Sequence, residues 1–337
     1  MINKNIVIVG GGPAGLEAAR TLRNAGLTPI LLEGSDRLGG HLLEWDSLFP
    51  SNQKASEVLE SLTADLEGIK WFTNSKVEEI SRIKDIYLVR TSSGYTFQAN
   101  AVLLTTGFSL FNATLKQELG YGIYDRVITN ADMERYFATG EHPCIHEPKT
   151  IGFVHCVGSR DEKICNRACS KVCCATAIKQ ACHIKEKFPL AQVYCFYMDL
   201  RMFGRGWEDM YYNAQTKYGI RFVRGRVCEV SEGMDATLNI KAEDTLLGKP
   251  IRMKMDLLVL MSGIRPRKDT EDIASNLHIE LGTDGFYSPR DPFIRTNESS
   301  NEGIFLAGTC TGPATLPETF SSARSAAARI IEYLESK

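Results

Sequence analysis

The sequence of 337 residues has no long apolar run, no excess of one charge and no C-x-x-C pair of cysteines. Its longest apolar runs, such as residues 257–261, are far shorter than the roughly 20 residues that a membrane-spanning helix needs. A formal net charge of −2 gives no electrostatic footprint for nucleic acid. The apolar run near the N-terminus ends at three glycines rather than in an export signal, so we expect a reducing, cytoplasmic location.

What the sequence does have is ten cysteines, which in a reducing compartment favour metal or redox chemistry over structural disulfides. Five of them lie close together: Cys156, Cys165, Cys169, Cys173 and Cys174. The middle three recur every four residues, which is one face of a helix if the helix begins early. Such a loop at a helix N-terminus suits an anionic iron–sulfur cluster, because backbone N–H groups oppose its charge. Zinc, a dithiol–disulfide site and buried structural thiols are the alternatives, although the first two normally show C-x-x-C.

A glycine-rich motif at residues 10–15 stands between an expected strand at residues 5–9 and an expected helix at residues 16–25. The motif reads G-x-G-x-x-G. Its first glycine permits a tight turn, the second lets the backbone approach a pyrophosphate, and the third lets helix and strand pack closely. A second expected strand, at residues 28–32, ends in Glu33, which can accept hydrogen bonds from ribose hydroxyls. The segment therefore predicts a dinucleotide site.

Further segments indicate FAD rather than NAD. Residues 36–41 contain a second glycine pair and resemble the segment that FAD enzymes of the disulfide reductase class lay along the ribityl chain and isoalloxazine ring. Val77 resembles the strand residue that meets adenine in that class, and residues 101–107 resemble its strand-to-loop motif. At residues 303–309, Thr309 replaces the acid of the usual Gly-Asp pair. The expected cofactor-binding residues are Gly10, Gly12, Pro13, Ala14, Gly15, Glu33, Gly34, Gly39, Gly40, His41, Leu42, Val77, Thr106, Gly107, Gly308, Thr309, Thr315 and Leu316.

A second strand–helix–strand unit is expected from strands at residues 150–155 and 191–198 and a helix at residues 171–188. No glycine fingerprint joins its first strand to its helix, because Gly158 is the only glycine between residues 153 and 203. We therefore expect that this unit does not bind NAD(P) in the usual way.

Other stretches carry weaker signals. Residues 108–119 and 132–138 are expected to be helices, and residues 141–146 a solvated loop rather than a metal site. A last helix should begin at Pro317 or Glu318, with its N-terminus toward the flavin. Three cysteines in helix or strand patterns are expected to be buried structural thiols: Cys182, Cys195 and Cys228. Cys310 is a weaker candidate for a redox thiol.

The chain resembles the A-type subunits of heterodisulfide reductases. The resemblance lies at residues 156–161, 169–174, 177–181, 197–201, 203–208, 224–227 and 303–308. It implies a [4Fe–4S] cluster held by Cys156, Cys169, Cys173 and Cys174, which leaves Cys165 as a neighbour. It also implies partner subunits of the B and C types and a homodimer. Because no C-x-x-C-x-x-C run exists, further clusters and electron bifurcation are not expected, and the chain resembles the short form of bacterial sulfur oxidisers.

The expected fold is α/β, with two nested Rossmann-type units of the thioredoxin reductase kind. A three-layer FAD domain would comprise residues 1–110 and 270–337, with a linker or helical segment at residues 111–149. An inserted, degenerate NAD(P)-like domain at residues 150–269 would carry the cluster. The expected function is electron relay between FAD and a [4Fe–4S] cluster within a complex of sulfur or thiol metabolism. The alternatives are a free-standing NAD(P)H-dependent FAD disulfide reductase and a regulatory flavoprotein with structural zinc.

Overall fold

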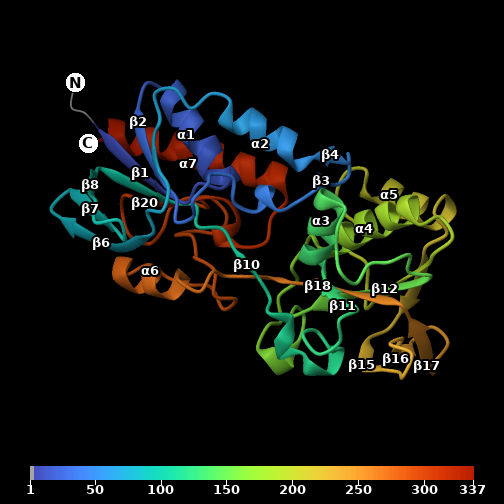
Figure 1. Cartoon of the computed structure of the whole chain (residues 1–337). Helices are drawn as coiled ribbons and strands as arrows, with labels where there is room; N and C mark the ends of the chain where they lie inside the picture. The colour runs from blue at the N-terminus through green and yellow to red at the C-terminus, as the bar shows by residue number, and fades with distance from the viewer. Residues whose placement is uncertain (1–3) are drawn as a thin grey trace. The chain divides into compact units, whose positions relative to one another are not determined.

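The computed structural model describes residues 4–337, which divide into two compact units (Figure 1). Unit 1 comprises residues 4–43, 56–109 and 265–337, and unit 2 comprises residues 44–55 and 110–264. The segment expected as a linker, residues 111–149, lies within unit 2. So do residues 44–55, which the sequence analysis assigned to the FAD domain.

Unit 1 is built on a five-stranded parallel sheet with the strand order β20-β9-β1-β2-β5. The strands are β1 (Asn5–Val9), β2 (Thr28–Leu32), β5 (Lys70–Phe72), β9 (Ala101–Leu104) and β20 (Ile304–Leu306). Four consecutive residues of β1 are buried, as are all residues of β9. Both faces of a parallel sheet are covered, which explains why these strands read as continuous apolar runs.

Two layers cover this sheet, so unit 1 has three layers in all. Helices α1 (Pro13–Asn24) and α7 (Leu316–Glu335) pack against each other on one face (Figure 1). On the other face lies an antiparallel sheet of β6 (Val77–Ile83), β7 (Ile86–Thr91) and β8 (Thr96–Ala99), with α6 (Thr270–Leu277) against β6. One buried cluster joins the two sheets and includes Val7, Val89 and Leu277.

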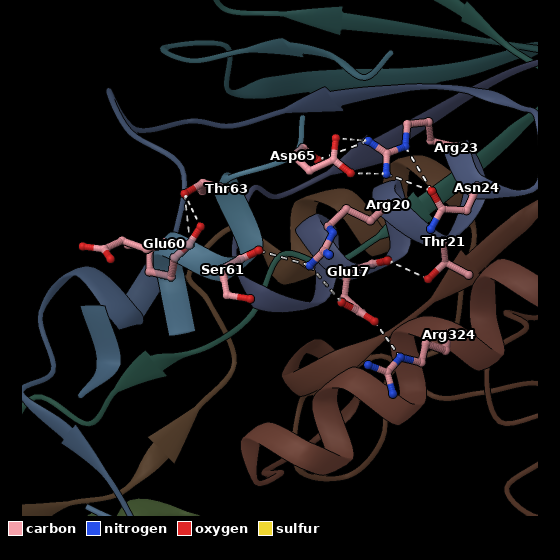
Figure 2. A network of polar contacts seen from close by, with 11 residues as sticks. Glu17, Arg20, Thr21, Arg23, Asn24, Glu60, Ser61, Thr63, Asp65 and Arg324 are labelled. Atoms are coloured by element: carbon pink, nitrogen blue, oxygen red, sulfur yellow. Dashed lines mark hydrogen bonds and ion pairs between the residues drawn. The ribbon is translucent and has the colours of Figure 1, made fainter. Parts of the chain in front are cut away.

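A polar network fastens the outer side of α1 to its neighbours in unit 1 (Figure 2). Glu17 forms an ion pair with Arg324 of α7 at 2.5 Å. One turn further on, Arg20 donates to the carbonyl oxygen of Ser61, and Arg23 forms an ion pair with Asp65 at 2.6 Å. These contacts fix the helix whose N-terminus carries the glycine motif.

Unit 2 repeats the plan with a parallel sheet of order β11-β18-β12-β13-β14. Its strands are β11 (Val127–Thr129), β12 (Thr150–Val157), β13 (Gln192–Tyr197), β14 (Arg221–Arg224) and β18 (Leu257–Ser262). Its helices are α3 (Asn130–Thr139), α4 (Cys173–Lys187) and α5 (Trp207–Thr216). An antiparallel sheet is formed by β15 (Val227–Glu232), β16 (Leu238–Asp244) and β17 (Lys249–Met255).

Two buried clusters hold unit 2 together. One lies between the parallel sheet and its helices and contains Phe153, Ile178 and Trp207; the other lies toward β15–β17 and contains Leu238 and Leu260.

The remaining elements of the two units are short. They are η1 (Gly40–Leu43), β3 (Ser47–Leu48), β4 (Gln53–Lys54), α2 (Ala55–Thr63), β10 (Ser109–Leu110), η2 (Ala113–Leu115), η3 (Gln117–Leu119), η4 (Glu162–Ile164), β19 (Ile264–Arg265) and η5 (Gly308–Thr311).

The α/β architecture with two Rossmann-type sheets is confirmed, and the strands expected at residues 5–9 and 28–32 have the expected bounds. The helix expected at residues 108–119 is wrong, because that stretch contains only β10 and two short 3₁₀ turns. The Asn112 side chain accepts a hydrogen bond from the backbone of Thr114, which favours a local turn over a helix.

Candidate cofactor and cysteine sites

The three glycines of the G-x-G-x-x-G motif, Gly10, Gly12 and Gly15, meet two different structural requirements. Gly10 has φ +113°, and a Cβ there would stand 2.4 Å from the carbonyl oxygen of Thr105. A Cβ on Gly15 would stand 2.0 Å from the carbonyl oxygen of Gly10. At Gly12, by contrast, the nearest atom is the Cα of Gly40 at 4.0 Å. The fold therefore requires glycine at the first and third positions, whereas Gly12 borders open space at the N-terminus of α1.

Glu33 is held in a fixed orientation by the backbone on both sides. Its Oε2 accepts a hydrogen bond from Gly11 N at 2.7 Å, and its Oε1 accepts one from Ser35 N, also at 2.7 Å. A carboxylate has about four acceptor positions, so two remain for another donor. The predicted ribose contact is compatible with this geometry.

The expected cofactor residues at the ends of these strands line one cavity of about 290 Å³ in unit 1. Five predicted residues line it: Gly10, Glu33, Gly34, Val77 and Thr106. The buried hydroxyl of Thr106 has no hydrogen-bonding partner, so a bound polar ligand could satisfy it. Arg267 and Asp269 also line the cavity. Neither residue was among the predicted ones, because both follow β19 without a recognisable sequence motif.

The second glycine pair lies against the first. Gly39 N donates to the carbonyl oxygen of Gly11 at 2.8 Å, and a Cβ on Gly40 would stand 3.2 Å from the Cα of Gly12. The His41 ring stacks on Phe108 with 4.2 Å between ring centroids, and Leu42 is buried. The structure thus brings residues 10–15 and 39–42 together, although they are separate in the sequence.

The residues after β20 lie beside the two glycine-rich segments of unit 1. A Cβ on Gly308 would stand 2.7 Å from that of Ala14, and Thr309 Oγ1 lies 3.9 Å from the position of a Cβ on Gly107. Thr315 is the N-cap of α7, which begins at Leu316 rather than at the expected Pro317 or Glu318. The Thr315 hydroxyl and the Glu318 carboxylate form a capping box, so this hydroxyl already has a structural partner. Pro13 occupies the first turn of α1, where its missing N–H costs nothing.

Cys310 is not placed for redox chemistry. Its thiol is buried and donates to the carbonyl oxygens of Leu104 and Ala307 at 3.3 and 3.1 Å. Burial raises the pKa of Cys310 to about 12, so the thiol stays protonated near neutral pH.

The cysteine-rich stretch is an irregular loop that follows β12 and leads into α4. Three of its non-glycine residues have positive φ, namely Arg160, Cys165 and Lys171, as does Cys156 near the end of β12. Because α4 begins only at Cys173, close to the expected start at residue 171, the early start that would place Cys165 and Cys169 on one helical face does not occur. The left-handed conformation of Lys171, with φ +60°, prevents the helix from beginning earlier.

Three thiols come together at the start of α4. Hydrogen bonding by the Cys173 thiol lowers the pKa of Cys156 to about 7 and that of Cys174 to about 4. The pKa of Cys173 itself is raised, because it is the shared donor. The fourth expected ligand, Cys169, accepts a hydrogen bond from Lys171 N at 3.3 Å, and Cys165 is exposed.

Within residues 4–337, no three His, Cys, Asp or Glu side chains are arranged so that they could hold a metal ion. The four expected ligands are therefore not preformed into a metal cage, although thiolates are the donors that iron–sulfur clusters use. Of the other cysteines, Cys182 and Cys195 are buried as expected, but the expectation for Cys228 is wrong, because it is exposed. Cys228 lies on β15, whose exposed residues face away from the core.

Comparison with known proteins assigns the chain to a protein family. The family described as pyridine nucleotide-disulphide oxidoreductase matches residues 4–142 and 174–327. The chain belongs to this family. It is therefore an oxidoreductase, and the expected fold is confirmed. The stretch between the two matched segments, residues 143–173, contains most of the cysteine-rich loop, which is where this chain departs from the family pattern.

Among curated proteins, the chain is 30% identical to the second A-type iron-sulfur subunit of CoB–CoM heterodisulfide reductase from Methanopyrus kandleri, with 97% of this chain and 64% of that protein covered. It is 40% identical to the A-type subunit of the H₂:CoB–CoM heterodisulfide,ferredoxin reductase from Methanothermobacter marburgensis, with 69% and 36% covered. The resemblance to the A-type subunits of heterodisulfide reductases is thus confirmed. The chain spans about one to two thirds of the length of these relatives.

Among solved structures, thioredoxin reductase of Lactococcus lactis matches with a TM-score of 0.72 at 17% identity, covering 99% of this chain and 100% of that one. Thioredoxin reductase of T. acidophilum matches with a TM-score of 0.70 at 17% identity and 99% coverage of both chains. These matches concern the fold alone. No helix formed by residues 4–337 is both long enough and apolar enough to cross a membrane.

Proposed function

We propose that this chain is the FAD- and [4Fe–4S]-containing electron-transfer subunit of a heterodisulfide reductase-like complex in sulfur or thiol metabolism. Unit 1 would hold the flavin and unit 2 the cluster. When bound, the two groups supply two-electron and one-electron chemistry respectively. The residues of this chain bind them, orient them and limit the access of water.

The proposal for FAD is carried by the open space at Gly12. Its neighbours Gly10 and Gly15 are glycines because the fold leaves no room for a side chain, whereas nothing in unit 1 comes closer than 4.0 Å to a Cβ on Gly12. A pyrophosphate at the N-terminus of α1 accounts for a glycine there. The adenosine half would occupy the 290 Å³ cavity, beside Glu33, Val77 and the unpartnered Thr106 hydroxyl.

The proposal for a cluster rests on the donor set. Cys156, Cys173 and Cys174 are neighbours, and Cys169 precedes them in a loop that is not part of α4. The same loop lies outside the segments that match the oxidoreductase family, so a feature specific to this chain's relatives is expected there. Two matched relatives are named as A-type heterodisulfide reductase subunits, and one of these names describes an iron-sulfur subunit.

The chain covers only part of the length of those relatives. We therefore propose its partner subunits as well. Subunits of the B and C types would carry the substrate chemistry, and the chain would form a homodimer. Alone, the chain should then show little turnover with sulfur compounds.

The test is to measure iron, acid-labile sulfide and flavin in one sample of anaerobically purified protein. We expect about four iron, four sulfide and one FAD per chain, the composition of one [4Fe–4S] cluster and one flavin. Flavin without iron after anaerobic reconstitution would refute the cluster. Thiolate-bound zinc in place of iron would favour the regulatory flavoprotein.

The reductase alternative has its own test. A free-standing NAD(P)H-dependent enzyme should lose its oxidised flavin absorbance rapidly when NADH or NADPH is added under anaerobic conditions. We expect no such bleaching, because the turn after β12 lacks the glycine fingerprint and contains Arg160, Asp161 and Glu162 instead.

A further inference from the structure

A second cavity, of about 230 Å³, lies in unit 2 at the carboxyl ends of three parallel strands. It is bordered by the end of β12, by Phe196 and Met198 at the end of β13, and by Gly225 after β14. Ligands of open α/β sheets bind outside the carboxyl ends of the strands, so this is a favourable place for a binding site. Cys156, a proposed cluster ligand, borders this cavity, but the proposed function assigns no role to the cavity itself.

The charges around this cavity favour an anion. Glu118 and Asp161 line it, but both carboxylates pair with Lys116, at 3.0 and 2.6 Å. The two other cations of the lining, Lys163 and Arg226, are not within ion-pair distance of any carboxylate of residues 4–337, although Lys163 lowers the pKa of Glu118 and Arg226 lowers that of Asp161. Three cations therefore face two carboxylates, and the surplus positive charge lies on solvent-exposed side chains at the edge of the cavity.

Arg226 is held with its guanidinium beside uncharged acceptors. It donates to Met198 Sδ at 2.8 Å and to the carbonyl oxygen of Arg160 at 2.7 Å. Both acceptors are uncharged, so these contacts orient the guanidinium without neutralising its positive charge. Such an arginine can donate hydrogen bonds to a carboxylate or a similar head group.

A buried polar side chain also lines the cavity. His155 is 7% exposed, and its ring lies close enough to the Cys174 thiol to lower the pKa of that thiol, but neither ring nitrogen forms a hydrogen bond of normal geometry. Buried polar atoms without partners are rare in native proteins, and a bound polar ligand is one way in which they are satisfied.

Two thiols complete the lining. Cys156 is the last residue but one of β12, and Cys228 is exposed, with its Sγ donating to the carbonyl oxygen of Arg226 at 3.6 Å. We propose that this cavity is a binding site for a small organic anion with a carboxylate or comparable head group, which lies between Arg226 and Cys228. The two cations that would bind the anion, Lys163 and Arg226, are not proposed ligands of the flavin or of the cluster.

Cys228 allows a direct test, since it can be alkylated in the holoprotein without touching a proposed cofactor ligand. Iodoacetate is a small carboxylate, and iodoacetamide is its neutral counterpart of nearly the same size. In both reactions the thiolate sulfur bonds to the methylene carbon and iodide leaves. Site-resolved mass spectrometry gives the ratio of the two rates at each cysteine.

Cys165 is the internal control, because it is also exposed and lies between Lys163 and Arg167 in the sequence, but it does not line the cavity. We expect the iodoacetate-to-iodoacetamide rate ratio at Cys228 to exceed that at Cys165 by about fivefold, the effect of one close favourable charge pair in a solvent-exposed site. The rate at Cys228 should saturate with iodoacetate, and excess acetate should slow it without affecting Cys165.

Variants locate the binding group. Arg226→Gln should lower the ratio at Cys228 to that at Cys165, whereas Arg252→Gln, an exposed arginine on β17 outside the cavity, should leave it unchanged. Equal ratios at the two cysteines of the wild-type protein would overturn the proposal. So would an absence of competition by acetate, which needs no variant and therefore no assumption about folding.

Discussion

Lys179 and Glu134 form an ion pair at 2.6 Å in which the two side chains are only 3% and 5% exposed. Gln180 donates to Glu134 Oε1 at 2.7 Å, and Asp46 N donates to Oε2 at 3.1 Å. Lys179 also donates to the carbonyl oxygen of Ser47 at 2.6 Å. This network attaches residues 44–55 to α3 and α4, which explains why that segment belongs to unit 2.

Replacing Lys179 by Met should therefore destabilise unit 2 strongly, by about 3–5 kcal/mol, because Glu134 is left charged, buried and unpaired. The double variant Lys179→Met/Glu134→Leu should be less destabilised than the single one, since no lone charge remains. Urea unfolding followed by tryptophan fluorescence suits this measurement, because Trp45 and Trp207 both lie in unit 2.

The matched control is Lys241→Met, which removes an exposed pair with Glu229 at 2.8 Å in the same unit. Exposed pairs contribute about 0–1 kcal/mol, so its unfolding midpoint should hardly move. An equal effect of the two lysine variants would contradict the view that burial makes the Lys179–Glu134 pair important.

Sequence patterns predicted the parts of this fold that depend on local periodicity. The strands at residues 5–9 and 28–32 and the glycine turn between strand and helix are visible in the residues themselves. Arg267 and Asp269 could not be found in this way, because they reach the cofactor cavity only through the tertiary fold. The same holds for Glu134 and Lys179, whose pairing joins two helices that are far apart in the sequence.

The cysteine loop shows the limit of a periodicity argument. Three cysteines spaced by four residues would lie on one helical face only if the helix began early, and of the three only Cys173 lies on α4. Positive φ at Cys165 and Lys171 places the others in an irregular loop. The spacing of residues indicates a helix only when no residue between them leaves the helical conformation. The identity of a side chain such as Lys171 does not predict that its backbone is left-handed.

Alanine at Gly12 and at Gly15 should separate cofactor binding from folding. Gly12→Ala has room within unit 1, so the flavin-free protein should keep its unfolding midpoint while flavin affinity falls at least about tenfold, because the backbone can no longer approach the pyrophosphate. Gly15→Ala places a Cβ 2.0 Å from the Gly10 carbonyl oxygen, so it should destabilise the flavin-free protein as well.

Flavin release can be followed by the recovery of free flavin fluorescence, and stability by urea unfolding of the flavin-free protein. If Gly12→Ala bound flavin as tightly as the wild-type protein, the pyrophosphate would not lie at this turn. The assignment of the cavity beside Glu33 would then fail with it.

Cys165 and Cys169 form a second discriminating pair, since both lie in the loop before α4 and only one is a proposed ligand. Cys169→Ala should lose most of the iron of the anaerobically purified protein, because a thiolate ligand is removed. Cys165→Ala should keep about four iron per chain. Iron analysis and the visible absorbance of the cluster on both variants decide between them. The reverse result would mean that Cys165 rather than Cys169 is the ligand, and the proposal of a cluster would still stand.

Cys310 predicts how stability depends on pH. Burial raises the pKa of its thiol to about 12, whereas an unfolded thiol ionises near about 8.5. Above that lower value the unfolded state binds fewer protons than the folded state, so the free energy of unfolding falls as pH rises. The contribution is fully present below about pH 8.5 and is lost progressively up to about pH 12.

Between about pH 8 and pH 10 this one thiol should lower the free energy of unfolding by about 2 kcal/mol. Cys310→Ala removes the ionisable group, so its unfolding free energy should decline with pH by that much less than the wild-type value, although it is lower at the starting pH because of the lost packing. Urea unfolding at both pH values measures the difference. Cys228→Ala, which removes an exposed thiol, should leave the wild-type pH dependence unchanged. A parallel decline in the wild-type protein and Cys310→Ala would mean that the thiol ionises equally in both states, which the two carbonyl hydrogen bonds and the burial of Cys310 argue against.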